Sequence, residues 1–105
     1  MPIQKLTNKN NLEELNRIKK IVAIVLKKHG IKKASIFGSY VRGEQKEDSD
    51  IDIIIEPTKN MSLLDFAGIK LDLQKELRMK VDLTDYKTIR PEIKGKVLKE
   101  EVRVI

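Results

Sequence analysis

An isoleucine-rich stretch that carries two aspartates, Ser49-Asp50-Ile51-Asp52-Ile53-Ile54-Ile55, constrains this chain most. In a β-strand alternate side chains share a face, so Asp50 and Asp52 point together while Ile51, Ile53 and Ile55 point to the other face. Two carboxylates so near to each other repel unless a cation lies between them. Mg²⁺ binds such oxygen ligands and keeps its remaining coordination positions for water and phosphate. The stretch therefore predicts a buried strand with a Mg²⁺ site on its polar face.

Upstream, a second apolar segment ends at Gly38 and Ser39. Glycine has no side chain, so its backbone can approach a phosphate closely, and a helix that begins just after Gly38 would direct N–H groups at it. We therefore expect this turn to supply the phosphate-binding half of a nucleotide site.

The order Gly38-Ser39-x-x-Arg42-Gly43, followed by Ser49-Asp50-x-Asp52, resembles the signature of the DNA polymerase β-like nucleotidyltransferase superfamily. The short chain, the helix start Ser62-Leu63-Leu64-Asp65 and the strand Lys80-Val81-Asp82-Leu83 more narrowly resemble the minimal nucleotidyltransferases, the antitoxin partners of HEPT-domain toxins. The resemblance runs from about Ser35 to the C-terminus.

This resemblance implies an α/β (α+β) fold, the palm of the superfamily, in which helices flank a small mixed β-sheet. The strand that carries Asp82 would lie beside the strand that carries Asp50 and Asp52 and would supply a third carboxylate. Asp85 competes for that role, although its place at the expected end of the strand is typical of a turn aspartate.

The resemblance also implies a mechanism, in which two Mg²⁺ ions hold a nucleoside triphosphate while an acceptor hydroxyl attacks its α-phosphorus and pyrophosphate leaves. The implied catalytic and metal-binding residues are Asp50, Asp52 and Asp82. The implied nucleotide-binding residues are Gly38, Ser39, Arg42 and Gly43.

Some residues of the motif keep two interpretations. Ser39 either donates to a triphosphate oxygen or caps the short helix. Arg42 either forms a charged fork on a phosphate or pairs with Glu44 or Glu47 at the surface. For Ser49 we predict a hydrogen bond to the turn before the strand.

The acceptor is expected on another protein, because so small a chain offers a triphosphate site without a second lobe for a substrate. Members of the minimal family transfer AMP from ATP to a tyrosine of a cognate HEPT toxin, which implies an antitoxin that forms a hetero-oligomer. Two alternatives stay open: a non-catalytic antitoxin that masks its toxin by binding, and a nucleotidyltransferase for small molecules of the aminoglycoside type that needs a partner subunit.

Composition limits the other classes of function. A chain of 105 residues predicts one domain, 1–105. The absence of cysteine and of an apolar signal segment predicts a cytoplasmic protein, and no apolar stretch is long enough for a bilayer. The net charge of +6 could attract nucleic acid, but only 4% of the residues are aromatic and little is available to stack on bases.

Hydrophobic spacing predicts the order of helices and strands. We expect a polar lead-in before a first helix, whose start is marked by a capping-box-like pair at Asn11 and Glu14. The predicted segments are the lead-in Pro2 to Asn10, a helix to Gly30, a strand Ala34 to Phe37, a strand Ile51 to Glu56, a helix capped by Ser62, a strand Val81 to Thr84, a helix opened by Pro91 and an extended tail Val102 to Ile105.

Overall fold

The computed structural model describes residues 2–44, 46 and 50–105, with only the backbone described for 2–11. The predicted hydrogen bond of Ser49 and the predicted ion pair with Glu47 cannot be located, because both residues lie outside the described residues. The elements are α1 (Pro2–Lys28), β1 (Ala34–Phe37), α2 (Ser39–Arg42), β2 (Ile51–Ile55), α3 (Leu63–Leu77), β3 (Val81–Asp85), the 3-10 helix η1 (Tyr86–Thr88), α4 (Pro91–Glu100) and β4 (Val102–Arg103).

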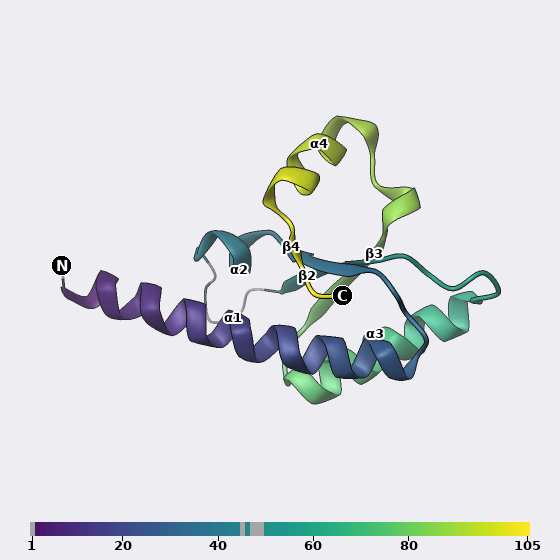
Figure 1. Ribbon diagram of the computed structural model, residues 1–105, viewed down its shortest axis with the longest axis horizontal. Helices are drawn as coiled ribbons and strands as arrows, with labels where there is room; N and C mark the ends of the chain where they lie inside the picture. The colour runs from purple at the N-terminus through teal and green to yellow at the C-terminus, as the bar shows by residue number, and fades with distance from the viewer. Residues whose placement is uncertain (1, 45, 47–49) are drawn as a thin grey trace.

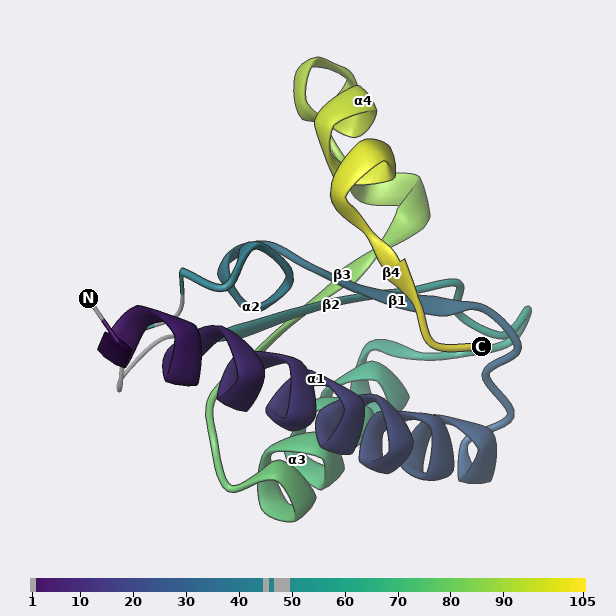
Figure 2. The same ribbon diagram turned by 60° about the vertical axis from the view of Figure 1, so that its left-hand side comes forward.

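The strands form one mixed sheet in the order β3-β2-β1-β4. The central strand β1 pairs antiparallel with β2 and β4, whereas β2 and β3 are parallel. Parallel neighbours require a crossover connection, and α3 provides it. Helices α1 and α3 lie on one face of the sheet, and α4 stands over the opposite face (Figures 1 and 2). The predicted mixed sheet, with the strand of Asp82 beside the strand of Asp52, is confirmed.

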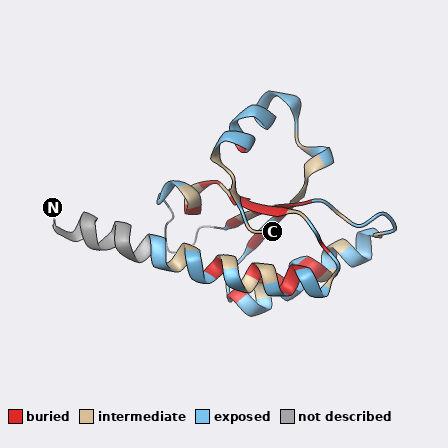
Figure 3. Cartoon of the chain, in the orientation of Figure 1, coloured by how far each residue is buried: buried red, intermediate tan, exposed pale blue. Residues whose placement is uncertain are grey.

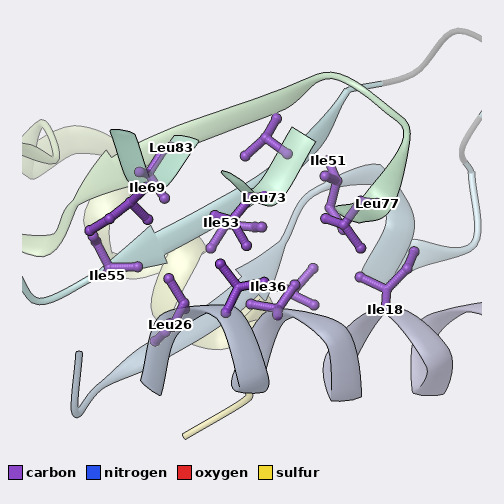
Figure 4. Packing of buried hydrophobic residues seen from close by; sticks show 14 of the residues in the cluster. Ile18, Leu26, Ile36, Ile51, Ile53, Ile55, Ile69, Leu73, Leu77 and Leu83 are labelled. Carbon is purple, nitrogen blue, oxygen red and sulfur yellow. The ribbon is translucent and has the colours of Figure 1, made fainter. Parts of the chain in front are cut away.

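The hydrophobic core lies between the sheet and the helices α1 and α3. Alternate β2 residues Ile51, Ile53 and Ile55 are fully buried there, as the period of a strand requires. Helix α1 contributes Ile18 and Leu26, among others, to the same cluster (Figure 4). Buried residues are concentrated along the sheet and the inner faces of the two helices, while α4 is largely exposed (Figure 3). The polar face of the sheet is therefore the face left for chemistry.

The predicted start of the first helix is wrong. Helix α1 begins at Pro2 and passes through the supposed lead-in Pro2 to Asn10 and through Asn11, so the helix does not start at Asn11. Most residues of the segment are tolerated in helices, and Pro2 stands at the first helical position, where its missing N–H costs no hydrogen bond. Once a helix has formed, each added residue costs little, and Asn at 10 and 11 is too weak a breaker to stop it.

Helix α3 begins where the sequence predicts. Ser62 accepts a hydrogen bond from the Asp65 N–H at 3.1 Å, and the Asp65 carboxylate accepts one from the Ser62 N–H at 3.1 Å. This reciprocal pair is a capping box. Among the apolar residues of α3, Leu77 is buried, but Leu63 and Leu64 are exposed beside the cap.

The C-terminal tail and the C-terminal end of α1 are held by different contacts. The C-terminal tail is extended as predicted, and β4 adds a short strand to the edge of β1. Directly after the C-terminal end of α1, the His29 ring lies 2.7 Å from the Asp72 carboxylate and links this end of α1 to α3. Among the described residues, no helix is both long and apolar enough to cross a membrane.

Candidate active site

Asp52 lies on the polar face near the start of β2, and β2 runs between β1 and β3. Its register partner on β1 is Phe37 and its partner on β3 is Asp82. Parallel strands in register place these two carboxylates side by side, so that the charge of each acts on the other. The paired strands thus bring together residues 30 positions apart in sequence.

The turn after β1 closes over Asp52. Gly38 has φ 84° and ψ −151°, a combination that only glycine adopts readily. A Cβ at Gly38 would overlap Oδ2 of Asp52 and would lie 3.2 Å from its Cγ. The backbone of Gly38 therefore passes close to the carboxylate of Asp52 on β2, and its predicted approach to a phosphate stays a prediction.

The environment of Asp52 opposes its negative charge. Burial raises the pKa of Asp52 to about 6, and the charge of Asp82, the hydrogen bond with Asp82 and the charge of Asp50 act in the same direction. The positive charge of Arg42 acts the other way, which places Arg42 close enough to influence the site. Asp52 therefore lies among negative charges that a bound cation would relieve.

Asp50 and Asp85 lie outside the central pair of carboxylates, Asp52 and Asp82. Asp50 precedes β2 by one residue and is exposed, although its charge still reaches Asp52. Asp85 ends β3 opposite Ile55, and its carboxylate accepts a hydrogen bond from the Lys87 N–H at 2.8 Å. Asp85 thus caps η1, as a turn aspartate does. Of the two carboxylates considered for the third position, Asp82 is the one beside Asp52.

The short helix α2 follows the Gly38 turn directly. The carbonyl of Gly38 accepts from the N–H of Val41 at 3.1 Å and of Arg42 at 3.2 Å. The carbonyl of Ser39 accepts hydrogen bonds from the N–H of Gly43 and, at 2.9 Å, from the N–H of Glu44. Gly43 takes the left-handed conformation, φ 71°, that ends the helix. The two glycines of the motif therefore have conformational roles at both ends of α2, and the Ser39 hydroxyl caps nothing there.

Arg42 is held by carboxylates. Its Nε donates to Glu44 at 2.7 Å and its Nη1 donates to Glu100, at the end of α4, at 3.0 Å. The predicted alternative of a surface pair with Glu44 is thus realised in this state of the protein. Nothing local in the sequence indicated Glu100, because 58 residues separate it from Arg42.

A second polar contact crosses the same face of the sheet. The buried Ser35 hydroxyl and the Tyr86 hydroxyl are 2.8 Å apart, and Tyr86 also bonds the Glu101 carboxylate at 3.1 Å. The Lys33 ammonium lies 4.6 Å from the centre of the Tyr86 ring. Sequence reasoning missed these residues, since a buried serine within an apolar strand was the only available signal.

The carboxylates of the site suit one kind of metal binding. Among the described residues, no three His, Cys, Asp or Glu side chains converge as a ready-made metal cage. Mg²⁺ commonly uses one or two carboxylates and takes its other ligands from water and substrate phosphates. The adjacent carboxylates of Asp52 and Asp82 fit that kind of binding.

Known proteins share this part of the chain. The polymerase beta nucleotidyltransferase family matches residues 19–105. A Methanocaldococcus jannaschii protein with the provisional name of protein adenylyltransferase is 47% identical over 91 residues, which cover 87% of this chain and 98% of that protein. Protein adenylyltransferase MntA of Thermococcus cleftensis is 41% identical over 75 residues, or 71% of this chain and 76% of that protein.

Solved structures share the fold. One, described provisionally as a minimal nucleotidyltransferase, superposes with a TM-score of 0.76 at 34% identity and covers 87% of this chain and 93% of its own. A toxin–antitoxin structure with AMP-PNP has a TM-score of 0.73 at 21% identity, covering 83% of this chain and 72% of its own, which establishes a common fold. The chain belongs to the polymerase β nucleotidyltransferase family, and it is a nucleotidyltransferase of the minimal type.

The raised pKa of Asp52 has a consequence for stability. A carboxyl whose pKa is higher in the folded state binds its proton more tightly there, so its contribution to stability is complete below the unfolded pKa of about 3.9 and is lost as the pH rises through about 6. The full shift corresponds to about 3 kcal/mol, which we halve to about 1.5 kcal/mol because the side chain is partly exposed.

We therefore expect the free energy of unfolding of the metal-free protein to fall by about 1.5 kcal/mol between pH 4 and pH 7.5 relative to Asp52→Asn. Urea unfolding in the presence of a chelator measures both proteins across this range. Parallel pH profiles for the two proteins would contradict the crowding of negative charge at Asp52.

Proposed function

We propose that this chain is a Mg²⁺-dependent protein adenylyltransferase that transfers AMP from ATP to a tyrosine hydroxyl of a HEPT-domain toxin, and that it acts as the antitoxin of that pair. The observation that carries the proposal is the Asp52 carboxylate, which lies beside Asp82 and directly under the backbone of Gly38. Similarity to MntA and to the Methanocaldococcus jannaschii protein supports protein adenylylation as the reaction.

The catalytic assignment gives each carboxylate a role. Asp50, Asp52 and Asp82 would hold two Mg²⁺ ions, with Asp52 and Asp82 as the central pair. When bound, Mg²⁺ neutralises phosphate charge and stabilises the entering and leaving oxygens. Asp82, the more exposed of the central pair, is assigned to accept the proton of the attacking hydroxyl.

The phosphate-binding assignment rests on the turn after β1. Gly38 allows the backbone to approach, while Ser39, Arg42 and Gly43 lie around the start and end of α2. In the proposed reaction the acceptor oxygen forms a bond to the α-phosphorus, the bond from that phosphorus to the bridging oxygen breaks, and pyrophosphate leaves. Positioning and charge neutralisation would supply most of the rate.

The protein acceptor follows from what surrounds the site. The polar face of the sheet is bordered by α2 and by the slender α4, of which only Val97 is buried. Within the described residues, nothing resembles a second lobe that could orient a small substrate (Figure 2). A docked partner protein would provide the missing orientation, and we accordingly propose a cytoplasmic hetero-oligomer with the toxin.

The nucleotide half of this proposal can be tested without the partner. Mg²⁺ with ATP at 100 times its dissociation constant stabilises a folded protein by about 2.7 kcal/mol. We expect a corresponding rise in melting temperature for the wild-type chain and no rise for Asp50→Asn combined with Asp52→Asn. An unchanged rise in the double variant would overturn the assignment of these aspartates.

A further inference from the structure

The guanidinium of Arg42 is held by two carboxylates that differ in origin. Glu44 follows on the same turn and its side chain is 65% exposed, so this contact is a local surface pair. Glu100 comes from the far end of α4 and its side chain is only 23% exposed, against 37% for Arg42. The Arg42–Glu100 pair is therefore the better shielded of the two and the more costly for a ligand to break.

The positive charge of Arg42 also acts on the carboxylate pair. Its charge opposes the rise in the pKa of Asp52, so the guanidinium and the Asp52 carboxylate interact electrostatically. The Glu100 carboxylate therefore occupies an anion-binding position on the edge of the proposed nucleotide site. Carboxylate and phosphate oxygens compete for the same N–H donors, because arginine binds both with the same fork geometry.

Glu100 is placed there by the fold. Helix α4 stands over the sheet and returns to it at its C-terminal end (Figure 1). At that end Glu100 bonds Arg42, and the next residue, Glu101, bonds Tyr86. The carboxylates of two successive residues thus hold the same end of α4, but only one of them contacts the proposed phosphate-binding residues.

We propose that the Glu100 carboxylate stands in for a triphosphate oxygen on Arg42, and that ATP must displace Glu100 to bind. The inference rests on the proposed function, since it takes Arg42 as a phosphate ligand. Glu100 then lowers the affinity for nucleoside triphosphates, whereas ligands that lack the outer phosphates do not compete with Glu100 for Arg42 and bind with unchanged affinity.

Calorimetric titration with Mg²⁺·ATP tests the inference in wild type, Glu100→Gln and Glu101→Gln. Glutamine at 100 keeps the size of the side chain and removes its charge, so we expect ATP to bind about two- to fivefold more tightly, as for loss of an ion pair of modest strength. Glu101→Gln is the matched control, because its amide oxygen still accepts from the Tyr86 hydroxyl and the Arg42–Glu100 pair is intact. It should bind ATP as the wild type does.

Adenosine provides the second arm of the experiment, since it carries no phosphate. Glu100→Gln should bind adenosine as the wild type does, and the gain for ATP should disappear when Arg42→Gln is added. Equal ATP affinities of wild type and Glu100→Gln, or an equal gain for adenosine or for Glu101→Gln, would overturn the inference while leaving the proposed function standing. Failure of every variant and of the wild type to bind ATP would overturn both.

Discussion

Asp82→Asn is expected to lower the rate of AMP transfer by about 10²- to 10³-fold, the usual cost of removing one group that stabilises charge in the transition state. Asp82 lies beside Asp52 in the parallel register, and its charge acts on Asp52 directly. Asparagine keeps the shape of the side chain but removes the charge. Nucleotide binding should weaken much less than transfer, because Asp52 and the Gly38 turn remain in place.

Asp85→Asn is the matched control for that variant, on the same strand and with the same chemical change. The Asp85 carboxylate accepts from the Lys87 N–H, and an asparagine oxygen can accept the same bond. Transfer should therefore stay within about twofold of the wild-type rate. A large loss in Asp85→Asn with a small one in Asp82→Asn would move the third carboxylate to Asp85.

Gly38→Ala is expected to damage both the fold and the site. A side chain at this φ and ψ costs about 1–3 kcal/mol of strain, and the added Cβ would push directly against the Asp52 carboxylate. Because misplacement of catalytic groups by about 1 Å can cost 10²-fold in rate, we expect a loss of transfer of that order. Urea unfolding and a transfer assay on the same preparation separate the two effects.

Gly95→Ala is the control for the glycine substitution. Apart from the backbone of its own helix and its chain neighbours, no heavy atom of the described residues lies within 4 Å of a Cβ built at Gly95. The residue lies within α4, where alanine is the better helix former by about 1 kcal/mol. This variant should be slightly more stable than the wild type and equally active. If Gly38→Ala behaved in the same way, the close approach of backbone and carboxylate would have no functional importance.

Local patterns of the sequence predicted much of the fold. The alternation around Asp52 placed a polar side chain on the opposite face from its isoleucine neighbours, and the structure has Ile51 and Ile53 in the core. Ser62 and Asp65 predicted the start of α3, since a capping box uses only residues within one turn. The left-handed Gly43 at the end of α2 also belongs to a local motif.

Contacts between distant segments could not be predicted in the same way. The side-by-side placement of Asp52 and Asp82 depends on strand order and register, which hydrophobic periodicity does not encode, and it was expected only from the resemblance to a family. The pair of Arg42 with Glu100 and the contact of Tyr86 with Ser35 depend on how α4 and η1 return to the sheet. The predicted start of α1 at Asn11 is wrong because the capping signal there is weak, and the helix continues through it to Pro2.

The most direct test of protein adenylylation is mass spectrometry of the purified chain mixed with its cognate HEPT-domain partner, Mg²⁺ and ATP. We predict that the partner gains one or more AMP units on a tyrosine, that the gain requires Asp52, and that the isolated chain turns over ATP barely at all. A complex that suppresses toxicity without any added nucleotide would contradict this account and favour inhibition by masking, and rapid adenylylation of an aminoglycoside by the chain alone would contradict the protein acceptor.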